Sequence, residues 1–277
     1  MLPARTGTWG ASALTALIAG AAVGLSGCGA TAVVPHLATR GAASPATATP
    51  TTATPATATP ARPTAPAPTL AGQLMGVGAA GQVVAVSATS YGSTTATFTA
   101  YQRVPGGWQQ VFGPWTADIG YGGFAQPGHK HEGDGKTPSG SYAFDFFFGV
   151  APDPGVAFPW RTVTASNVVW DDDPASAHYN QWVDTSTGTD PGRHPEPMDN
   201  VPVYDYGADI AYNEEPVVSG AGSAIFLHVS DGGPTAGCVS LPVGNLLAVL
   251  RWLDPARAPR IIMGTAASIT AAAITTG

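Results

Sequence analysis

The amino-acid sequence predicts a mainly β fold with one or two helices, in a single domain that starts at residue 70. Short runs rich in Val, Thr and aromatic residues recur through this part, and turns rich in Gly and Pro separate them. One longer segment instead has its apolar residues at helical spacing. The chain has 277 residues, of which 44% are hydrophobic, so it carries enough apolar material for a packed core.

The predicted strands share this β-like composition and follow one another at short intervals. They are residues 82–89, 96–103, 108–112, 140–147, 167–170, 208–212, 224–230 and 260–263. Pro105, Gly106 and Gly107 separate the second run from the third, so these two runs predict a hairpin. The segment from Pro152 to Pro202 is rich in Pro, Asp, Asn and Gly, a composition typical of long functional or mobile loops.

Residues 243–253 predict the helix. Leucines recur at helical spacing between positions 246 and 253, Pro242 suits a helix start, and Asp254 with Pro255 predicts its end. The domain is expected to extend over residues 70–264. Residues 265–277 are small and polar, and we expect a flexible tail there.

The first 27 residues predict an export signal peptide that is removed. Arg5 precedes an apolar run from 11 to 27 that is too short and too rich in small residues for a membrane span of about 20 strongly apolar residues. Residues 25–28, Leu-Ser-Gly-Cys, are similar to the lipobox of bacterial lipoproteins. This resemblance implies that Cys28 carries a lipid and anchors the protein to the outer face of the cytoplasmic membrane, facing the cell wall. The alternative is an ordinary signal peptide with an incidental cysteine.

Residues 28–69 join this terminus to the domain and are rich in Ala, Thr and Pro. Pro50, Pro55 and Pro60 recur at every fifth position, which blocks helix and sheet and predicts an extended, semi-rigid spacer. A disordered leader without a spacing role is the alternative.

The charge distribution argues against a nucleic-acid partner. The net charge is −7, and all 18 acidic residues lie between Asp118 and Asp254 together with five Lys or Arg residues. A nucleic-acid-binding domain needs a basic face. Two cysteines cannot build a disulfide framework, and lipidation of Cys28 leaves Cys238 as a lone thiol.

The predicted strand at 224–230 brings a histidine toward this thiol. Alternation places Ile225, Leu227 and Val229 on one face and His228 on the opposite face. A Gly-rich turn from 231 to 237 follows and leads directly to Cys238.

A histidine and a cysteine joined by such a turn are typical of nucleophilic catalysis. A Cys nucleophile needs a base within hydrogen-bond reach and small neighbours that let backbone N–H groups face an oxyanion. Thr235 and Gly237 fit that need. The alternative is that both residues are structural: His228 would be a core histidine whose hydrogen bonds are satisfied, and Cys238 a small buried apolar residue.

These residues resemble the signature of the L,D-transpeptidase catalytic domain (YkuD) family. The resemblance lies in His228 followed by Thr-Ala-Gly-Cys-Val at 235–239. The Gly-Lys-Thr-Pro-Ser-Gly segment at 135–140 and the segment 222–228 are also similar to the family pattern. The resemblance extends over residues 80–264.

The resemblance implies a YkuD-like mixed β-sandwich or sheet core that forms one catalytic domain. It implies a cysteine-dependent L,D-transpeptidase that cross-links or remodels peptidoglycan stem peptides, with L,D-carboxypeptidase activity when water accepts the acyl group. Cys238 is the implied nucleophile, His228 the base, and the amides of Gly237 and Cys238 the oxyanion donors. A main-chain carbonyl is the implied third catalytic partner. No cofactor and no metal is expected, and we expect a monomer.

The sequence departs from the family pattern next to the cysteine. Ala236 stands where His is frequent, Ser240 stands where Arg is usual, and the interval from His228 to Cys238 is short. Recognition of a substrate carboxylate must therefore use another group. The basic residues left to supply it are Lys136, Arg161, Arg193 and Arg251. The sequence does not assign the substrate-binding residue among them.

Two other functions remain open at this point. A sortase-like transpeptidase is one, because His178, Cys238 and Arg251 occur in the order of that family, although Pro-Thr-Ala-Gly before the cysteine does not match it. The other is a catalytically weak or inactive wall-binding lipoprotein of the same fold, which the missing arginine makes plausible.

Two clusters could suggest a metal but lack the required spacing. In the segment His129-Lys130-His131-Glu132, the two histidines have strand spacing but lack a third clear ligand, so they are interpreted as solvated loop residues. The adjacent carboxylates at 171–173 lack the alternation of a calcium loop.

Overall fold

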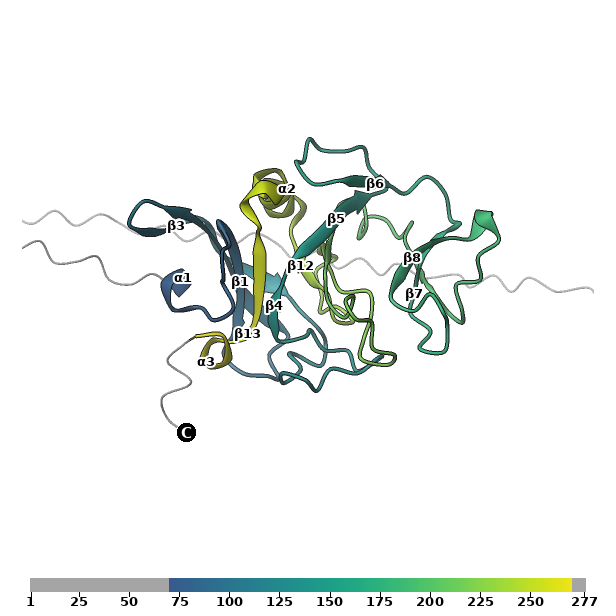
Figure 1. Ribbon diagram of the computed structural model, residues 1–277, viewed down its shortest axis with the longest axis horizontal. Coiled ribbons are helices and arrows are strands. Elements are labelled where there is room, and N and C mark those ends of the chain that lie inside the picture. Colours follow the sequence, from purple (N-terminus) through teal and green to yellow (C-terminus); the bar gives the residue numbers. More distant parts are fainter. Residues whose placement is uncertain (1–69, 271–277) are drawn as a thin grey trace, which may run out of the picture. The chain divides into compact units, whose positions relative to one another are not determined.

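The computed structural model describes residues 70–270, and their fold is mainly β, as predicted. The strands form a sheet of ten and a sheet of three (Figure 1). The predicted signal peptide, Cys28, the spacer up to residue 69 and residues 271–277 lie outside the described part of the chain.

The large sheet is mixed, with parallel pairs β1–β13, β11–β12 and β5–β6. In spatial order its strands are β4 (Gly140–Tyr142), β13 (Arg260–Thr265), β1 (Gln82–Ala88), β2 (Thr95–Val104), β3 (Gly107–Asp118), β12 (Val239–Leu241), β11 (Phe226–Val229), β10 (Gly207–Ile210), β5 (Phe144–Gly149) and β6 (Trp160–Thr162).

The small sheet and the helices complete the described part. The small sheet consists of β8 (Gln181–Asp184), β7 (Val168–Asp171) and β9 (Glu196–Pro197). The helices are α1 (Leu70–Gln73), α2 (Val243–Trp252) and α3 (Ala266–Ile269), with 3-10 turns at Thr185–Thr187 and Pro255–Arg257. In Figure 1, β7 and β8 lie beyond β5 and β6, away from β1 and β13.

The predicted hairpin is confirmed, and its second strand is longer than expected. Strands β2 and β3 pair antiparallel up to Val104 and Gly107. Pro114 suggests a strand end because it cannot donate a ladder hydrogen bond. The strand continues because the register shifts at this point, opposite Phe98 and Ala100. Gly113 permits the close approach, since a Cβ there would lie 2.3 Å from the carbonyl oxygen of Phe98.

The predicted helix is confirmed as α2, which packs against β11 and β12. Its Leu246, Val249 and Leu250 are fully buried in the main core, together with Leu227 of β11. Full burial of one such side chain contributes about 1.5–3 kcal/mol to folding. The helix therefore fixes the two strands that carry the histidine and the cysteine.

Two expectations need correction. The predicted strand at 140–147 is two strands, because β4 pairs with β13 while β5 pairs with β10 on the far side of the sheet. Composition shows that a segment is extended but not where it changes partner. The predicted flexible tail is also wrong for residues 265–270. Thr265 accepts the N–H of Ser268 and begins α3, and Ile269 is buried.

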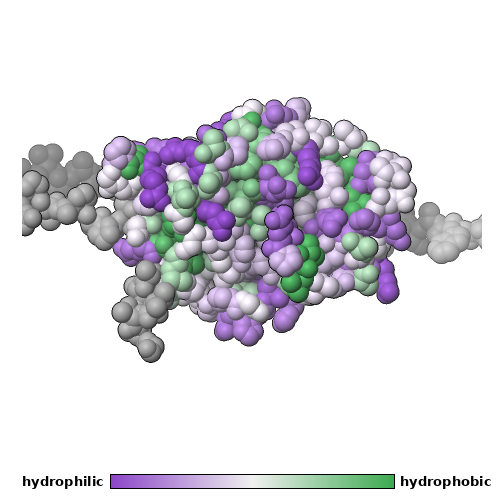
Figure 2. All heavy atoms as spheres, viewed as in Figure 1, coloured by the Kyte–Doolittle hydropathy of each residue, from purple (hydrophilic) through white to green (hydrophobic). Residues whose placement is uncertain are grey.

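No helix within residues 70–270 is long and apolar enough to span a membrane. On the face drawn in Figure 2, hydrophobic residues lie in small separate patches among hydrophilic ones. That arrangement is ordinary for a folded surface, where scattered apolar residues are common.

Candidate active site

Strand β11 presents its two faces as predicted. Ile225, Leu227 and Val229 all belong to the main core. Phe226 belongs to a second cluster, which also contains Cys238. The alternation therefore separates the structural face of this segment from the face that carries His228.

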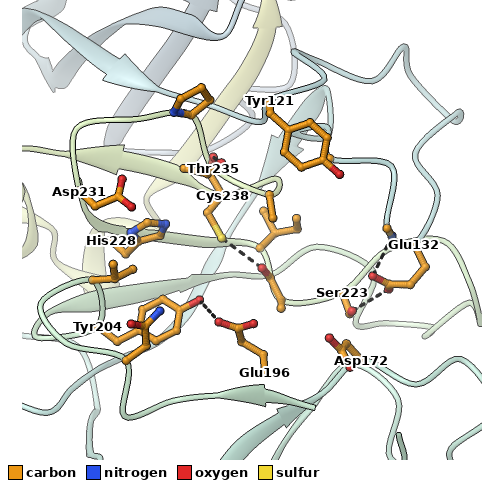
Figure 3. Close-up of a pocket in the computed structure, with 18 of the residues that line it drawn as sticks. Tyr121, Glu132, Asp172, Glu196, Tyr204, Ser223, His228, Asp231, Thr235 and Cys238 are labelled. Carbon is orange, nitrogen blue, oxygen red and sulfur yellow. Dashed lines mark hydrogen bonds between the residues drawn. The ribbon is translucent and has the colours of Figure 1, made fainter. Parts of the chain in front are cut away.

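Strand β12 starts directly after the cysteine and runs parallel to β11. His228 pairs with Ser240 in this ladder. The turn between the strands therefore returns the chain beside the histidine, and His228 and Cys238 point into the same cavity (Figure 3). We call this the reactive cavity.

Thr235 holds the turn before the cysteine. Its Oγ1 accepts the N–H of Gly237 at 3.1 Å and donates to the carbonyl oxygen of Cys238 at 2.7 Å. Gly237 has φ +155°, and a Cβ there would lie 3.0 Å from the carbonyl oxygen of Lys136. The sequence therefore needs Gly at 237, and the Thr235 hydroxyl engages one of the two amides expected to bind an oxyanion. The amide of Cys238 is the other.

The thiol of Cys238 is buried and uncharged in this arrangement. Its Sγ donates to the carbonyl oxygen of Ala224 at 3.2 Å and accepts the N–H of Phe226 at 3.3 Å. Burial raises the pKa of Cys238 to about 12, although the N–H of Phe226 acts in the opposite direction. The thiolate is therefore not preformed, and a base must remove the proton.

His228 has the geometry of that base. Its Nδ1 lies 2.8 Å from the carbonyl oxygen of Val229. A carbonyl can only accept, so Nδ1 carries the proton and Nε2 has the free lone pair. Burial lowers the pKa of His228 below its usual 6.5, while the bond to Val229 and nearby carboxylates act in the other direction. The ring is therefore neutral at pH 7 and able to accept a proton.

Tyr204 packs against His228 and, like it, lines the reactive cavity. The two rings meet edge to face, with centroids 5.6 Å apart. The hydroxyl of Tyr204 donates to Glu196 at 3.1 Å. The histidine is thus held by a carbonyl at one end and by a buried aromatic ring.

The reactive cavity has a volume of about 380 Å³ and is strongly acidic. Its lining includes Glu132, Asp172, Glu196 and Asp231, against the single ammonium of Lys130. Figure 3 shows Glu132 and Asp172 across the cavity from His228. An acidic cavity of this size favours a cationic group of a bound molecule.

Glu132 and Lys130 already have partners within the protein, whereas Asp172 is affected by its acidic neighbours. Glu132 accepts hydrogen bonds from the hydroxyls of Tyr179 and Ser223. Lys130 is buried and forms a 2.7 Å ion pair with Asp134. Burial, followed by repulsion from Glu132 and Glu196, raises the pKa of Asp172 to about 7.

A comparison with protein families decides the identity of this fold and site. The model of the L,D-transpeptidase catalytic domain family, YkuD, matches residues 79–265, which is more than half of the chain. The chain belongs to the L,D-transpeptidase catalytic domain family. No curated protein matches the sequence. Family membership implies a peptidoglycan-related transpeptidase function.

In the L,D-transpeptidase domain, none of the four basic residues expected to recognise a carboxylate lines the reactive cavity, which contains the thiol. Arg161 stacks on Phe146, with 3.5 Å between the guanidinium carbon and the ring centroid, and Arg251 donates to the carbonyl oxygen of Pro154. Sequence order cannot show these distances; the basic residue that does line the reactive cavity is Lys130.

The arrangement required by the sortase alternative is not assembled in the L,D-transpeptidase domain. His178 lines a different surface pocket together with Arg193. Arg251 lies at the end of α2, and neither His178 nor Arg251 lines the reactive cavity.

The residues missed from the sequence are Lys130, Glu132 and Tyr204. Lys130 and Glu132 lie in the segment interpreted as a solvated loop, yet Lys130 is only 8% exposed. Their one sequence signal is the nearby Gly-rich segment 133–140, which leads to β4. Nothing in the sequence links Tyr204 to His228. Within residues 70–270, one group of three possible metal ligands occurs, and it lies outside this cavity.

Proposed function

We propose that this protein is a cysteine-dependent L,D-transpeptidase that forms an acyl-enzyme on Cys238 and cross-links peptidoglycan stem peptides. The observation that carries the proposal is the hydrogen bond between Nδ1 of His228 and the carbonyl oxygen of Val229. It leaves Nε2 as a base that faces the same cavity as the thiol. The family membership of the domain supports the substrate class.

In the first step, Nε2 of His228 takes the proton of the Cys238 thiol. The thiol proton lies toward Ala224 in the resting structure, so it must turn away from that carbonyl first. The sulfur then attacks the carbonyl carbon of the L-residue that precedes the terminal D-residue. As the amide bond breaks, the protonated His228 gives its proton to the departing amine, and a thioester remains on Cys238.

In the second step, the amine of another stem peptide attacks the thioester. His228 takes a proton from this amine and returns it to the sulfur, so the enzyme is regenerated. Water in place of the amine yields L,D-carboxypeptidase activity. The negative intermediate needs N–H donors at the carbonyl oxygen. We assign this role to the amide of Cys238, joined by the amide of Gly237 if Thr235 releases it.

The acidic lining fits a donor or acceptor peptide that bears a free ammonium group. Glu132, Asp172 and Glu196 line the same cavity as the thiol, and a cation there is attracted by their negative charge. Lys130 is available for a substrate carboxylate only in competition with Asp134. We therefore propose that substrate choice depends more on an amine than on a carboxylate.

The position of the enzyme in the cell is a separate proposal. We propose that Cys28 is lipidated and that the Pro-rich spacer separates the domain from the outer face of the cytoplasmic membrane. A Cys28→Ala variant is expected to leave the membrane fraction, as judged by immunoblotting after fractionation. Unchanged membrane association would contradict lipidation.

The acyl-enzyme is tested by trapping it. A carbapenem, which acylates active-site nucleophiles through its strained amide, is expected to add its mass to the wild-type protein and not to Cys238→Ala. A synthetic tetrapeptide ending in a D-residue is expected to release that residue only with the wild type. A protein that never acylates, and whose Cys238→Ala variant binds cell-wall sacculi as well as wild type, would instead be an inactive wall-binding member.

A further inference from the structure

A second cavity, of about 320 Å³, shares no lining residue with the reactive cavity. Three carboxylates converge on it, from Asp145, Asp209 and Glu214. One oxygen of each lies within 4.8 Å of the corresponding oxygens of the other two. We call this the carboxylate cavity.

Three separate segments bring these carboxylates together. Asp145 lies in β5 and Asp209 in the neighbouring β10, while Glu214 follows in the loop after β10. The pairing of β10 with β5 shifts register between Ala208 and Ile210, so Asp209 occupies an irregular position of the ladder. Such irregularities redirect a side chain away from the regular alternation. The redirected carboxylate meets two others of the same charge.

Within residues 70–270, the Asp209 side chain interacts with the carboxyl group of Glu214 and forms no ion pair. It is 1% exposed, and its Oδ2 is a buried oxygen without a hydrogen-bond donor. A buried charged oxygen costs free energy unless it is paired, hydrogen-bonded or bound to a metal. Such an oxygen, in a cavity lined by three further carboxylates (Asp145, Glu214 and Glu215), points to a positive ligand.

Arg161 compensates these carboxylates only in part: its charge acts to lower the pKa of Asp209 and of Glu214, but it forms no ion pair with them. It is the only basic residue that lines the cavity, and its guanidinium stacks on the ring of Phe146. Among residues 70–270, no ion pair joins Arg161 to any carboxylate. The three carboxylates are therefore left without a direct counter-ion.

We propose that the carboxylate cavity binds a divalent hard cation, best matched by Ca²⁺, through Asp145, Asp209 and Glu214. All three ligands are oxygens and no His or Cys lines the cavity, a donor set that suits Ca²⁺ or Mg²⁺ rather than Zn²⁺. Ca²⁺ takes about six to eight oxygen ligands. Asp145 is exposed, so water molecules can supply the ligands that the three carboxylates do not. Mg²⁺ demands a more regular octahedron, which ligands from three separate segments provide less readily.

The bound cation would stiffen the segment that contacts the nucleophile. Asp209 pairs in the sheet with Phe226, whose N–H donates to Sγ of Cys238. The loop that starts near Glu214 ends at Ala224, whose carbonyl oxygen accepts the thiol hydrogen bond. Both contacts of the thiol thus belong to elements joined to the proposed ligands.

The test uses terbium luminescence with the full chain. Trp170 and Trp182 line the carboxylate cavity and can transfer excitation energy to a bound Tb³⁺ ion. Wild type is expected to show tryptophan-sensitised emission that Ca²⁺ displaces with an apparent Kd of about 10⁻⁴ to 10⁻³ M, the range of extracellular calcium modules. Mg²⁺ is expected to compete more weakly.

Asp209→Asn and Glu214→Gln are expected to weaken this binding at least tenfold, because each removes one proposed ligand charge. Asp199→Asn is the matched control, since it removes one exposed carboxylate that lines neither cavity. Circular dichroism checks folding, and the partly exposed Glu214 gives a second variant if Asp209→Asn does not fold.

Thermal unfolding distinguishes two ways in which the three carboxyl groups could be stabilised: by a bound cation, or by a proton shared between them. Wild type in 5 mM CaCl₂ is expected to unfold several degrees higher than in EDTA, and both ligand variants should lose that difference. Equal terbium binding by wild type and the two ligand variants would overturn the proposal. So would equal midpoints with CaCl₂ and EDTA together with variants more stable than wild type, because the carboxyl groups would then share a proton. Loss of acylation alone would affect the proposed function and not this one.

Discussion

The reactive cavity and the carboxylate cavity are both acidic, but they satisfy their carboxylates differently. In the reactive cavity, hydroxyl groups of Tyr179 and Ser223 donate to Glu132, and that of Tyr204 donates to Glu196. In the carboxylate cavity, the buried Oδ2 of Asp209 receives no donor. Carboxylates that accept hydrogen bonds from hydroxyl groups are held in fixed positions for a molecule that comes and goes. Carboxylates without donors indicate a ligand that stays.

The largest expected effect tests whether the two cavities are independent. Cys238→Ala removes the only thiol among residues 70–270, so acylation and release of the terminal D-residue should fall by more than about 10³-fold. Terbium binding should be unchanged, because Cys238 does not line the carboxylate cavity. Mass spectrometry and luminescence on the same preparation check both points. Loss of terbium binding in this variant would break the distinction between the cavities.

The second effect concerns the base. His228→Gln keeps a side chain of similar size but cannot accept the thiol proton, so the acylation rate should fall about 10²- to 10⁴-fold. Single-turnover acylation followed by mass spectrometry measures this loss. An Asp209→Asn variant saturated with substrate should retain far more activity than His228→Gln. A rate for His228→Gln close to that of wild type would remove His228 from the mechanism.

The third effect is the pH dependence of acylation in the wild type. Burial lowers the pKa of His228 below 6.5, so the neutral ring needed for proton transfer persists into mildly acidic solution. The rate should therefore fall only below pH 6.5, and then by about tenfold per pH unit. A profile of kcat/KM from pH 4.5 to 8 checks this. An acid limb above pH 6.5 would show that the ring is more solvated or more strongly paired than the structure indicates.

The fourth effect concerns the turn before the nucleophile. Thr235→Val removes the hydrogen bonds to the Gly237 amide and to the Cys238 carbonyl, and each such bond contributes about 0.5–1.5 kcal/mol. Urea unfolding should show a loss of about 1–3 kcal/mol. Thr235→Ser, which keeps the hydroxyl, should restore most of it. A loss in Thr235→Ser as large as that in Thr235→Val would show that the hydroxyl group alone does not account for the stability of the turn.

The smallest expected effect is a pH dependence of stability caused by the charge of Asp172. Burial and repulsion raise its pKa from 3.8 to about 7 in the folded protein. Between these pH values the folded state holds a proton that the unfolded state has lost, so the free energy of unfolding falls as the pH rises. Asp172→Asn should therefore unfold a few degrees above wild type at pH 8 and at the same temperature near pH 4. Differential scanning calorimetry measures both, and a constant difference would contradict the assignment.

The parts of the molecule that follow local rules could be predicted. Alternation in β11, the hairpin of β2 and β3, and the leucine spacing of α2 depend on neighbouring residues and match the structure. His228 and Cys238 could be paired because one short turn joins them. The resemblance of this segment to the YkuD family is confirmed by the family match.

The parts that depend on long-range contacts could not be predicted. Glu132 meets Ser223, and Tyr204 meets Glu196 and His228, only after the sheets have formed. The strand at 140–147 divides because its halves find different partners. The sequence shows many acidic residues between Asp118 and Asp254, but only the structure shows that Asp209 is buried with an unpaired oxygen.

Strand β12 lies in the interior of the large sheet, between β3 and β11, and Cys238 stands at its start. An interior strand is held by neighbours on both sides, whereas Lys130, Glu132 and Asp172 lie in loop segments outside the strands. Loops tolerate substitution and insertion better than interior strands. Changes in those segments can therefore alter substrate preference while the sheet keeps the sulfur of Cys238, the proposed nucleophile, in place.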